Sequence, residues 1–199
     1  MKKIAVFCGA SSGFDPVYTQ EAKKMGKILT EKGISVIFGG GKVGMMGALA
    51  DEILSLQGDI TGIIPHFLRH EEVEHDKVKN MLVSKGMSDR KITISKMVDG
   101  YIAMPGGFGT LDEVMEVLTL GQLHIEHKPI GFLNTKGFFN PLIQQFDLMV
   151  KEGFLKQENR DMVLIDENPE RLLKKMENYI PPKVSKMIDT IATIKPSKK

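Results

Sequence analysis

The sequence predicts a single α/β domain on a doubly wound parallel sheet, a Rossmann-like fold of three layers, αβα. Short apolar runs alternate with helical patterns along almost the whole chain of 199 residues. These runs are apolar on both faces of a strand, which is typical of a parallel sheet covered by helices on both sides. Glycine-rich turns follow three of the runs, and ligands of such sheets bind beyond the carboxyl ends of the strands.

The apolar runs give the predicted strands. The first run, Ile4–Cys8, follows two lysines and superficially resembles a signal peptide. It is too short for the apolar region of a signal peptide, and Phe7 is a poor residue to precede a cleavage site, so a first buried strand is the better interpretation. The predicted strands are Ile4–Cys8, Ser35–Phe38, Ile60–Ile64, Gly100–Met104, Ile130–Leu133 and Met162–Ile165.

Helices are predicted between the strands, because apolar residues recur there at helical spacing. Two asparagine–proline pairs, Asn140-Pro141 and Asn168-Pro169, are predicted to be the N-cap and first residue of two later helices. The predicted buried faces of the first two helices are Tyr18, Ala22, Met25 and Leu29, and Met45, Leu49 and Ile53.

Two segments depart from this alternation. The polar segment His66–Lys79 is predicted to form a loop over the edge of the sheet. Beyond Ile180, apolar residues from Val184 to Ile194 follow helical spacing, with lysines outside the stripe. We therefore predict a Rossmann-like domain over residues 1–180 and an amphipathic, basic C-terminal tail over residues 181–199.

The composition is that of an ordinary globular protein, with 42% hydrophobic and 26% charged residues. The net charge of +2 provides no broad basic field, so it predicts no nucleic-acid or membrane partner. No run approaches the length of a membrane span. The single cysteine, Cys8, cannot form an internal disulfide and is predicted to be a small core residue in a cytoplasmic protein.

The first glycine-bearing turn is Cys8–Gly13, directly after the first strand. Small residues such as Gly9 let a ligand approach the backbone, and the hydroxyl of Ser11 can donate to phosphate or sugar oxygens. A tight turn with serine capping explains the same residues equally well.

The second turn contains Gly39, Gly40, Gly41 and Gly44, and it formally satisfies the pattern G-x-G-x-x-G. A dinucleotide site also needs an acidic residue at the end of the next strand, and Asp59 stands at its start instead. NAD binding is therefore disfavoured, whereas binding of a mononucleotide phosphate is not.

The third turn, Pro105–Glu113, joins a buried strand to a helix. Its bare backbone and the helix dipole predict an anion site. Thr110 and Glu113 have the spacing of a capping box, which would satisfy the first N–H groups without a ligand. The dipole is expected to keep Asp112 and Glu113 ionised, and an ionised Glu113 could bind ribose hydroxyls, orient a water or stabilise positive charge on a sugar.

Two further groups of polar residues have side chains that could bind a ligand. Arg90 and Lys91 are suited to phosphate, although the pair alone is equally typical of a solvated helix face. His66, His70 and Glu72 suggest a metal site, but they lie in a predicted loop without a fixed frame, so we predict no metal.

Taken together, these motifs resemble the LONELY GUY family of cytokinin riboside 5′-monophosphate phosphoribohydrolases, long mislabelled as lysine decarboxylases. The resemblance runs in order from residue 1 to about residue 180. Its most specific part combines the turn Pro105–Glu113 with Met87-x-x-Arg90-Lys91 upstream. Departures are small, and the clearest are Asp112 where glutamate is frequent and Ala10 where serine is frequent.

The resemblance implies that Arg90 and Glu113 are the catalytic pair. It also implies a homodimer or larger homo-oligomer with the site near the subunit interface, and a reaction that requires no metal or organic cofactor. The implied nucleotide contacts are Glu72, Lys91, Gly107, Phe108, Gly109, Thr110, Leu111, Asp112 and Thr119.

The predicted function is hydrolysis of the N-glycosidic bond of adenosine 5′-monophosphate or its N6-substituted analogues, which yields free base and ribose 5-phosphate. The alternative is a non-enzymatic nucleotide-binding sensor or carrier in which Glu113 mainly caps its helix. A lysine decarboxylase is disfavoured, because such enzymes usually hold pyridoxal phosphate on a lysine and no lysine is singled out here.

Overall fold

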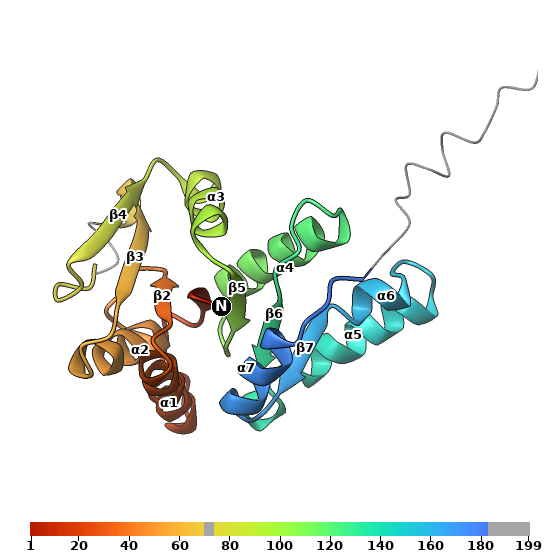
Figure 1. The fold of residues 1–199 in the computed structure, drawn as a ribbon, viewed down its shortest axis with the longest axis horizontal. Coiled ribbons are helices and arrows are strands. Elements are labelled where there is room, and N and C mark those ends of the chain that lie inside the picture. Colours follow the sequence, from red (N-terminus) through yellow and green to blue (C-terminus); the bar gives the residue numbers. More distant parts are fainter. Residues whose placement is uncertain (70–73, 183–199) are drawn as a thin grey trace, which may run out of the picture.

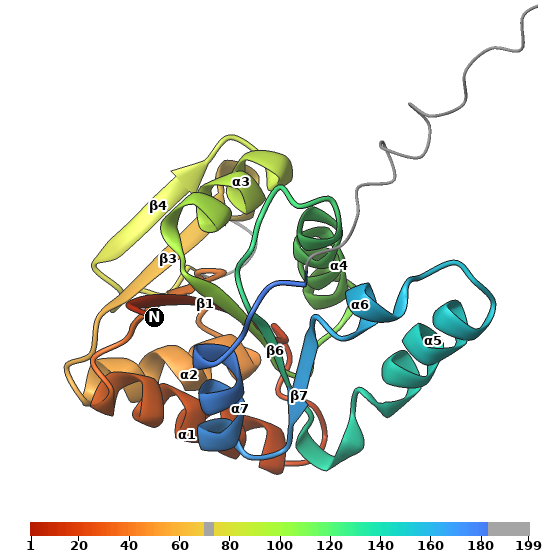
Figure 2. The same cartoon turned by 45° about the vertical axis from the view of Figure 1, so that its right-hand side comes forward.

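The computed structural model describes residues 1–69 and 74–182 of the chain. Over this range the fold is a single seven-stranded sheet between two layers of helices, as Figures 1 and 2 show from two directions. The predicted fold class is therefore confirmed. The predicted C-terminal tail lies almost wholly outside the described residues.

The strands are parallel and lie in the order β4-β3-β2-β1-β5-β6-β7. All six predicted strands are present, and their ends differ from the prediction by one residue or not at all. The strands are β1 (Lys3–Phe7), β2 (Ser35–Phe38), β3 (Ile60–Pro65), β4 (Asn80–Ser84), β5 (Gly100–Ala103), β6 (Ile130–Leu133) and β7 (Val163–Asp166).

The seventh strand, β4, was not predicted. It is an edge strand that pairs only with β3, and most of its residues are exposed or half-buried, so its sequence lacks an apolar run on both faces. The polar segment His66–Lys79 was predicted as a loop over this edge. Its described part contains a short 3-10 helix, His66–Leu68, and ends where β4 begins.

Residues of one strand alternate between the two halves of the core. Ile4 and Val6 of β1 pack with α1 (Val17–Glu31), α2 (Gly44–Ser55) and α7 (Pro169–Glu177). Ala5 and Phe7 pack on the opposite face, which is covered by three further helices (Figure 2). These helices are α3 (Met87–Met97), α4 (Phe108–Gln122) and α5 (Asn140–Lys151).

The predicted helix faces and one of the two predicted caps are confirmed. Ala22, Leu29 and Leu49 are fully buried. The side chain of Asn168 accepts hydrogen bonds from the backbone N–H groups of the first turn of α7, as predicted. Asn140 is not an N-cap: α5 begins at this residue, and its side-chain oxygen accepts a hydrogen bond from Asn134 instead.

The turns after β1, β2 and β5 meet at the carboxyl edge of the sheet, between strands whose connections run in opposite directions. The Gly9 N–H donates to the Pro105 carbonyl at 3.0 Å, and the Met45 N–H donates to the Gly9 carbonyl at 3.1 Å. Gly44 has φ +66°, and a Cβ there would stand 2.2 Å from the Ala10 carbonyl oxygen. Only glycine allows this close approach of two backbones.

Replacing Gly44 tests this packing of turns. We expect Gly44→Ala to lower the free energy of unfolding by about 2 kcal/mol or more, because the left-handed backbone and the clash with Ala10 act together. Urea denaturation measures the loss. The matched substitution Gly109→Ala, at a helical glycine with open space around it, should not lower stability. Equal effects at the two positions would contradict this account.

Candidate active site

A cavity of about 540 Å³ lies where the three turns meet, which is a size suited to a mononucleotide. Its floor is the backbone of the turns after β1 and β5. Arg90 and Glu113 project into it from α3 and α4. Of the predicted contacts, the cavity wall contains Gly9, Ser11, Arg90, Gly107, Gly109, Thr110 and Glu113.

The start of α4 differs from the capping box that the sequence predicts. The helix begins at Phe108, with Gly107 as N-cap in an extended conformation, and no side chain caps it. Thr110 is therefore already inside the first turn, and Glu113 is the sixth residue of the helix. The capping-box interpretation is wrong, because the glycine backbone starts the helix earlier. The first N–H groups of α4 face the glycine-rich turn with no partner inside the helix.

Arg90 and Glu113 form an ion pair inside the cavity. Their Nη2 and Oε1 atoms are 3.5 Å apart, and both residues are less than a tenth exposed. Gly39 makes room for the pair, because a Cβ there would lie 2.4 Å from Nη2 of Arg90. The buried Nε of Arg90 has no hydrogen-bond partner among the described residues. A buried guanidinium with a spare donor is ready to bind an acceptor on a ligand.

The Glu113 carboxyl titrates close to neutral pH. The pKa of this carboxyl is raised from an ordinary 4.5 to about 7, chiefly by burial. The charges of Arg90 and Lys91 oppose the rise, and those of Asp112 and Glu116 add to it. Desolvation thus outweighs the helix dipole, which was expected to keep this carboxyl ionised, and the carboxyl is only partly ionised near neutral pH. A carboxyl of this kind can exchange a proton near physiological pH.

Lys91 does not line the cavity. Its ammonium lies on the other side of the Arg90–Glu113 pair, within 3.2 Å of Asp112 and in closer contact with Glu116. These ion pairs raise the pKa of the lysine. The predicted phosphate contact would require the ammonium to leave both carboxylates.

The remaining predicted contacts lie outside the cavity wall. Phe108 projects into solvent at the start of α4, and the hydroxyl of Thr119 donates to the Met115 carbonyl at 2.7 Å on an exposed face. Glu72 lies outside the described residues. The predicted contacts Gly40, Gly41 and Gly44 belong to the second turn but do not line the cavity. Leu111 packs against the core and Asp112 pairs with Lys91, so neither lines the cavity.

The cavity also has apolar walls that the sequence did not single out. On one side Tyr18 and Phe138 meet edge to face, with ring centroids 6.0 Å apart, and Lys136 pairs with Asp15 beside them. On another side the wall consists of Met46, Ile64, Leu68 and Met87. Such walls suit a flat, weakly polar group such as a nucleobase. No local pattern marks Phe138, which reaches the site only through the packing of its loop.

Cys8 lies at the base of the cavity and is buried, as the sequence predicts. Burial, reinforced by the charge of Glu113, raises the pKa of its thiol far above the ordinary value. The thiol is therefore unreactive as a nucleophile.

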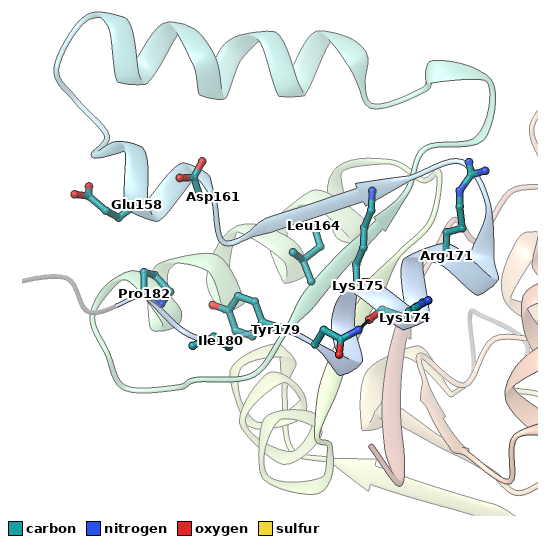
Figure 3. Close-up of a pocket in the computed structure, with 10 residues that line it drawn as sticks. Glu158, Asp161, Leu164, Arg171, Lys174, Lys175, Tyr179, Ile180 and Pro182 are labelled. Atoms are coloured by element: carbon teal, nitrogen blue, oxygen red, sulfur yellow. Dashed lines mark hydrogen bonds between the residues drawn. The ribbon is translucent and has the colours of Figure 1, made fainter.

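A second, shallower hollow lies along α6 (Gln157–Arg160), β7 and α7 (Figure 3). Two of the three cations in its lining are already engaged, since Arg171 and Lys175 each approach Asp166 to 2.9 Å. It also offers no buried polar group to a ligand. The cavity at the three turns is the better candidate site.

Two other expectations concern metals and membranes. Within residues 1–69 and 74–182, the structure contains no group of three or more histidine, cysteine or acidic side chains arranged to hold a metal ion. Two members of the histidine-rich segment considered above, His70 and Glu72, lie outside those ranges. None of the described helices is long and apolar enough to cross a membrane.

The fold and the cavity define a Rossmann-like protein with a cavity at the topological switch point of its sheet, where ligands of such sheets bind. Solved structures agree on the fold alone. The protein TM1055 is 20% identical with a TM-score of 0.70, covering 90% of this chain and all of that one. The molybdenum cofactor carrier protein of Chlamydomonas reinhardtii is 17% identical with a TM-score of 0.66. The match covers 89% of this chain and 98% of that one.

Sequence comparison is more specific. A family model described as "Possible lysine decarboxylase" matches residues 46–176. Cytokinin riboside 5′-monophosphate phosphoribohydrolase LOG of Oryza sativa subsp. japonica is 36% identical over 180 residues, which are 90% of this chain and 74% of that protein. LOG7 of Arabidopsis thaliana, named for the same activity, is 37% identical over 180 residues, which are 90% of this chain and 83% of that protein. The chain belongs to the LONELY GUY family, to which these phosphoribohydrolases also belong, as its motifs predict.

The raised pKa of Glu113 predicts how stability depends on pH. Between about pH 4.5 and 7 the folded protein retains a proton on Glu113 that the unfolded chain has already released. The free energy of unfolding should therefore fall by about 3 kcal/mol in wild type, relative to Glu113→Gln, as the pH rises through this window. Urea titrations at several pH values measure the difference. Parallel pH profiles for the two proteins would contradict the assignment.

Proposed function

We propose that the protein hydrolyses the N-glycosidic bond of adenosine 5′-monophosphate or of an N6-substituted analogue. The observation that carries the proposal is the buried Arg90–Glu113 pair beside the glycine-rich start of α4. Family membership supports it, because the relatives named above are phosphoribohydrolases. Which base the protein prefers is set by the apolar walls of the cavity.

The phosphate is assigned to the turn Pro105–Gly109. Unpaired N–H groups and the positive end of the α4 dipole converge there, and the backbone of Gly9 and the hydroxyl of Ser11 lie beside them in the same cavity. A phosphate bound there leaves the ribose near Glu113, further along the same helix. The base then reaches the apolar walls.

In the proposed reaction the bond between C1′ and the base nitrogen breaks, and its electron pair leaves with the base. The ionised carboxylate of Glu113 stabilises the positive charge that develops on the ribose and accepts a proton from the attacking water. The water oxygen bonds to C1′, and the departing base takes up a proton from solvent, to which Glu113 afterwards releases the proton that it accepted. Arg90 holds Glu113 in place and offers its free Nε–H to the nucleotide.

The alternative, a nucleotide sensor or carrier, loses its specific support. It required Glu113 to serve mainly as a helix cap, and no side chain caps α4. The decarboxylase in the family description fits the cavity poorly, since its described lining includes no lysine to hold pyridoxal phosphate. A cytoplasmic location remains part of the proposal.

Base release from nucleotides tests the proposed activity. Wild type should release free base from adenosine monophosphate, isopentenyladenosine monophosphate or both. Glu113→Gln should lower kcat/KM by about 10²- to 10⁴-fold, because charge stabilisation at the ribose is lost. Arg90→Ala should lower it by about 10²-fold or more, because Glu113 loses its partner and the nucleotide loses a donor. Chromatography of the released base measures the rates.

The matched control is Glu152→Gln, an exposed glutamate beyond the end of α5. It should leave kcat/KM unchanged. No base release from either nucleotide by wild type, or undiminished rates in both site variants, would contradict the proposed activity.

We also propose that a second copy of the chain covers the outer face of α3 and α4. Only three of the fifteen residues of α4 are buried, although its composition is apolar. Leu123 and Ile125 at its end and Ile92 on α3 are at least half exposed, and Phe108 is exposed at the start of α4. An apolar surface of this kind is typical of a subunit interface.

A charge placed on this face should separate the subunits. We expect Leu123→Glu to shift the protein toward monomer in sedimentation velocity, because a carboxylate would be desolvated in the interface. Leu56→Glu, on the opposite face of the sheet at the end of α2, is the control and should leave the assembly unchanged. A monomeric wild type, or equal effects of the two substitutions, would contradict the proposed interface.

A further inference from the structure

Two neighbouring ion pairs connect α3 to α4. Arg90 reaches Glu113 on the side of the cavity. Lys91, the next residue on α3, reaches Asp112 and Glu116 on the outer side. Two adjacent residues of one helix thus hold three carboxylates of the other.

The two carboxylates bound by Lys91 flank Glu113 on α4. Asp112 precedes it directly and Glu116 follows one turn later, so three negative charges fall within a single turn. Both flanking groups raise the pKa of Glu113, and Lys91 lowers it. A small hollow lined by Lys91, Glu113 and Glu116 lies between the two helices. The charge of the lysine therefore reaches the Glu113 carboxyl from outside the main cavity.

The side chain of Lys91 is 18% exposed, and its ammonium contacts both Asp112 and Glu116. Moving it to a phosphate in the cavity would leave both carboxylates unpaired beside Glu113. Coulomb repulsion among three carboxylates would then disfavour the ionised form that the reaction needs. The observed contacts therefore favour a lysine that stays where it is.

We propose that Lys91 is a positioning residue: it fixes α3 against α4 and balances the carboxylates on both sides of Glu113, instead of binding the nucleotide phosphate. This inference rests on the proposed function, in which Glu113 reacts as a carboxylate. Lys91 acts through Glu113 and does not touch the reacting atoms.

Charged and titratable groups face Glu113 from every element packed around it. Arg90 and Lys91 belong to α3, Asp112 and Glu116 belong to α4, Cys8 follows β1 and Tyr101 belongs to β5. Burial, followed by contact with Glu126, raises the pKa of Tyr101, and burial raises that of Cys8, so both are neutral near pH 7. Lys91, Asp112 and Glu116 do not line the cavity, so their charges can be changed without altering its walls.

The pH profile of kcat/KM tests the proposal through opposite shifts. Activity should rise with pH as Glu113 ionises. Lys91→Met should move this rise to higher pH by about half a unit or more, and Glu116→Gln should move it to lower pH, because each removes one charge of opposite sign near Glu113. The double variant should return toward wild type. Lys96→Met, an exposed lysine on the same helix, is the control and should leave the profile unchanged.

A phosphate ligand would behave differently. Its loss would raise KM at every pH without moving the rise in activity, and Glu116→Gln would not compensate. That pattern would overturn the proposal.

A second measurement does not depend on turnover. Titration of the Glu113 carboxyl by ¹³C NMR, assigned with Glu113→Gln, should show the same upward shift in Lys91→Met and downward shift in Glu116→Gln. An unchanged titration in both variants would overturn the proposed role of Lys91. If wild type released no base while the titrations shifted as expected, the proposed function would fail and the electrostatic role of Lys91 would stand.

Discussion

The ion pair between Arg90 and Glu113 is the interaction on which the rest of the site depends. Both side chains are buried, and a buried charge without a partner is strongly unfavourable. The surrounding backbone is arranged to accommodate them: Gly39 leaves room for the guanidinium, and the glycine-rich turn before α4 leaves room for a ligand beside the carboxylate. Because Arg90 does not fully offset the burial, Glu113 stays able to exchange a proton near neutral pH.

Neighbouring residues of α3 have separate tasks in this account. Arg90 faces the cavity and contributes to ligand binding, whereas Lys91 faces outward and sets the charge around Glu113. The apolar outer face of α3 and α4 lies next to both pairs. A second subunit bound there would further exclude water from Lys91 and its partners. Catalysis and assembly would then depend on the same two helices.

Much of the fold could be predicted from the sequence, because buried parallel strands appear as continuous apolar runs. Strand β4 could not be predicted, since an exposed edge needs no apolar run.

At the site, Arg90 and Glu113 follow from their motifs, and the structure brings them together. The capping box failed because Thr110 and Glu113 have the same spacing whether they cap a helix or lie within it. Phe138 could not be predicted, since only long-range packing brings it to Tyr18.

The central claim is that positive charge develops on the ribose, beside Glu113, as the base departs. The most direct measurement is the secondary isotope effect on kcat/KM with adenosine monophosphate carrying deuterium at C1′. An oxocarbenium-like transition state predicts that base release from the deuterated nucleotide is measurably slower than from the unlabelled nucleotide. Equal rates of base release, or loss of phosphate before the base, would contradict the account.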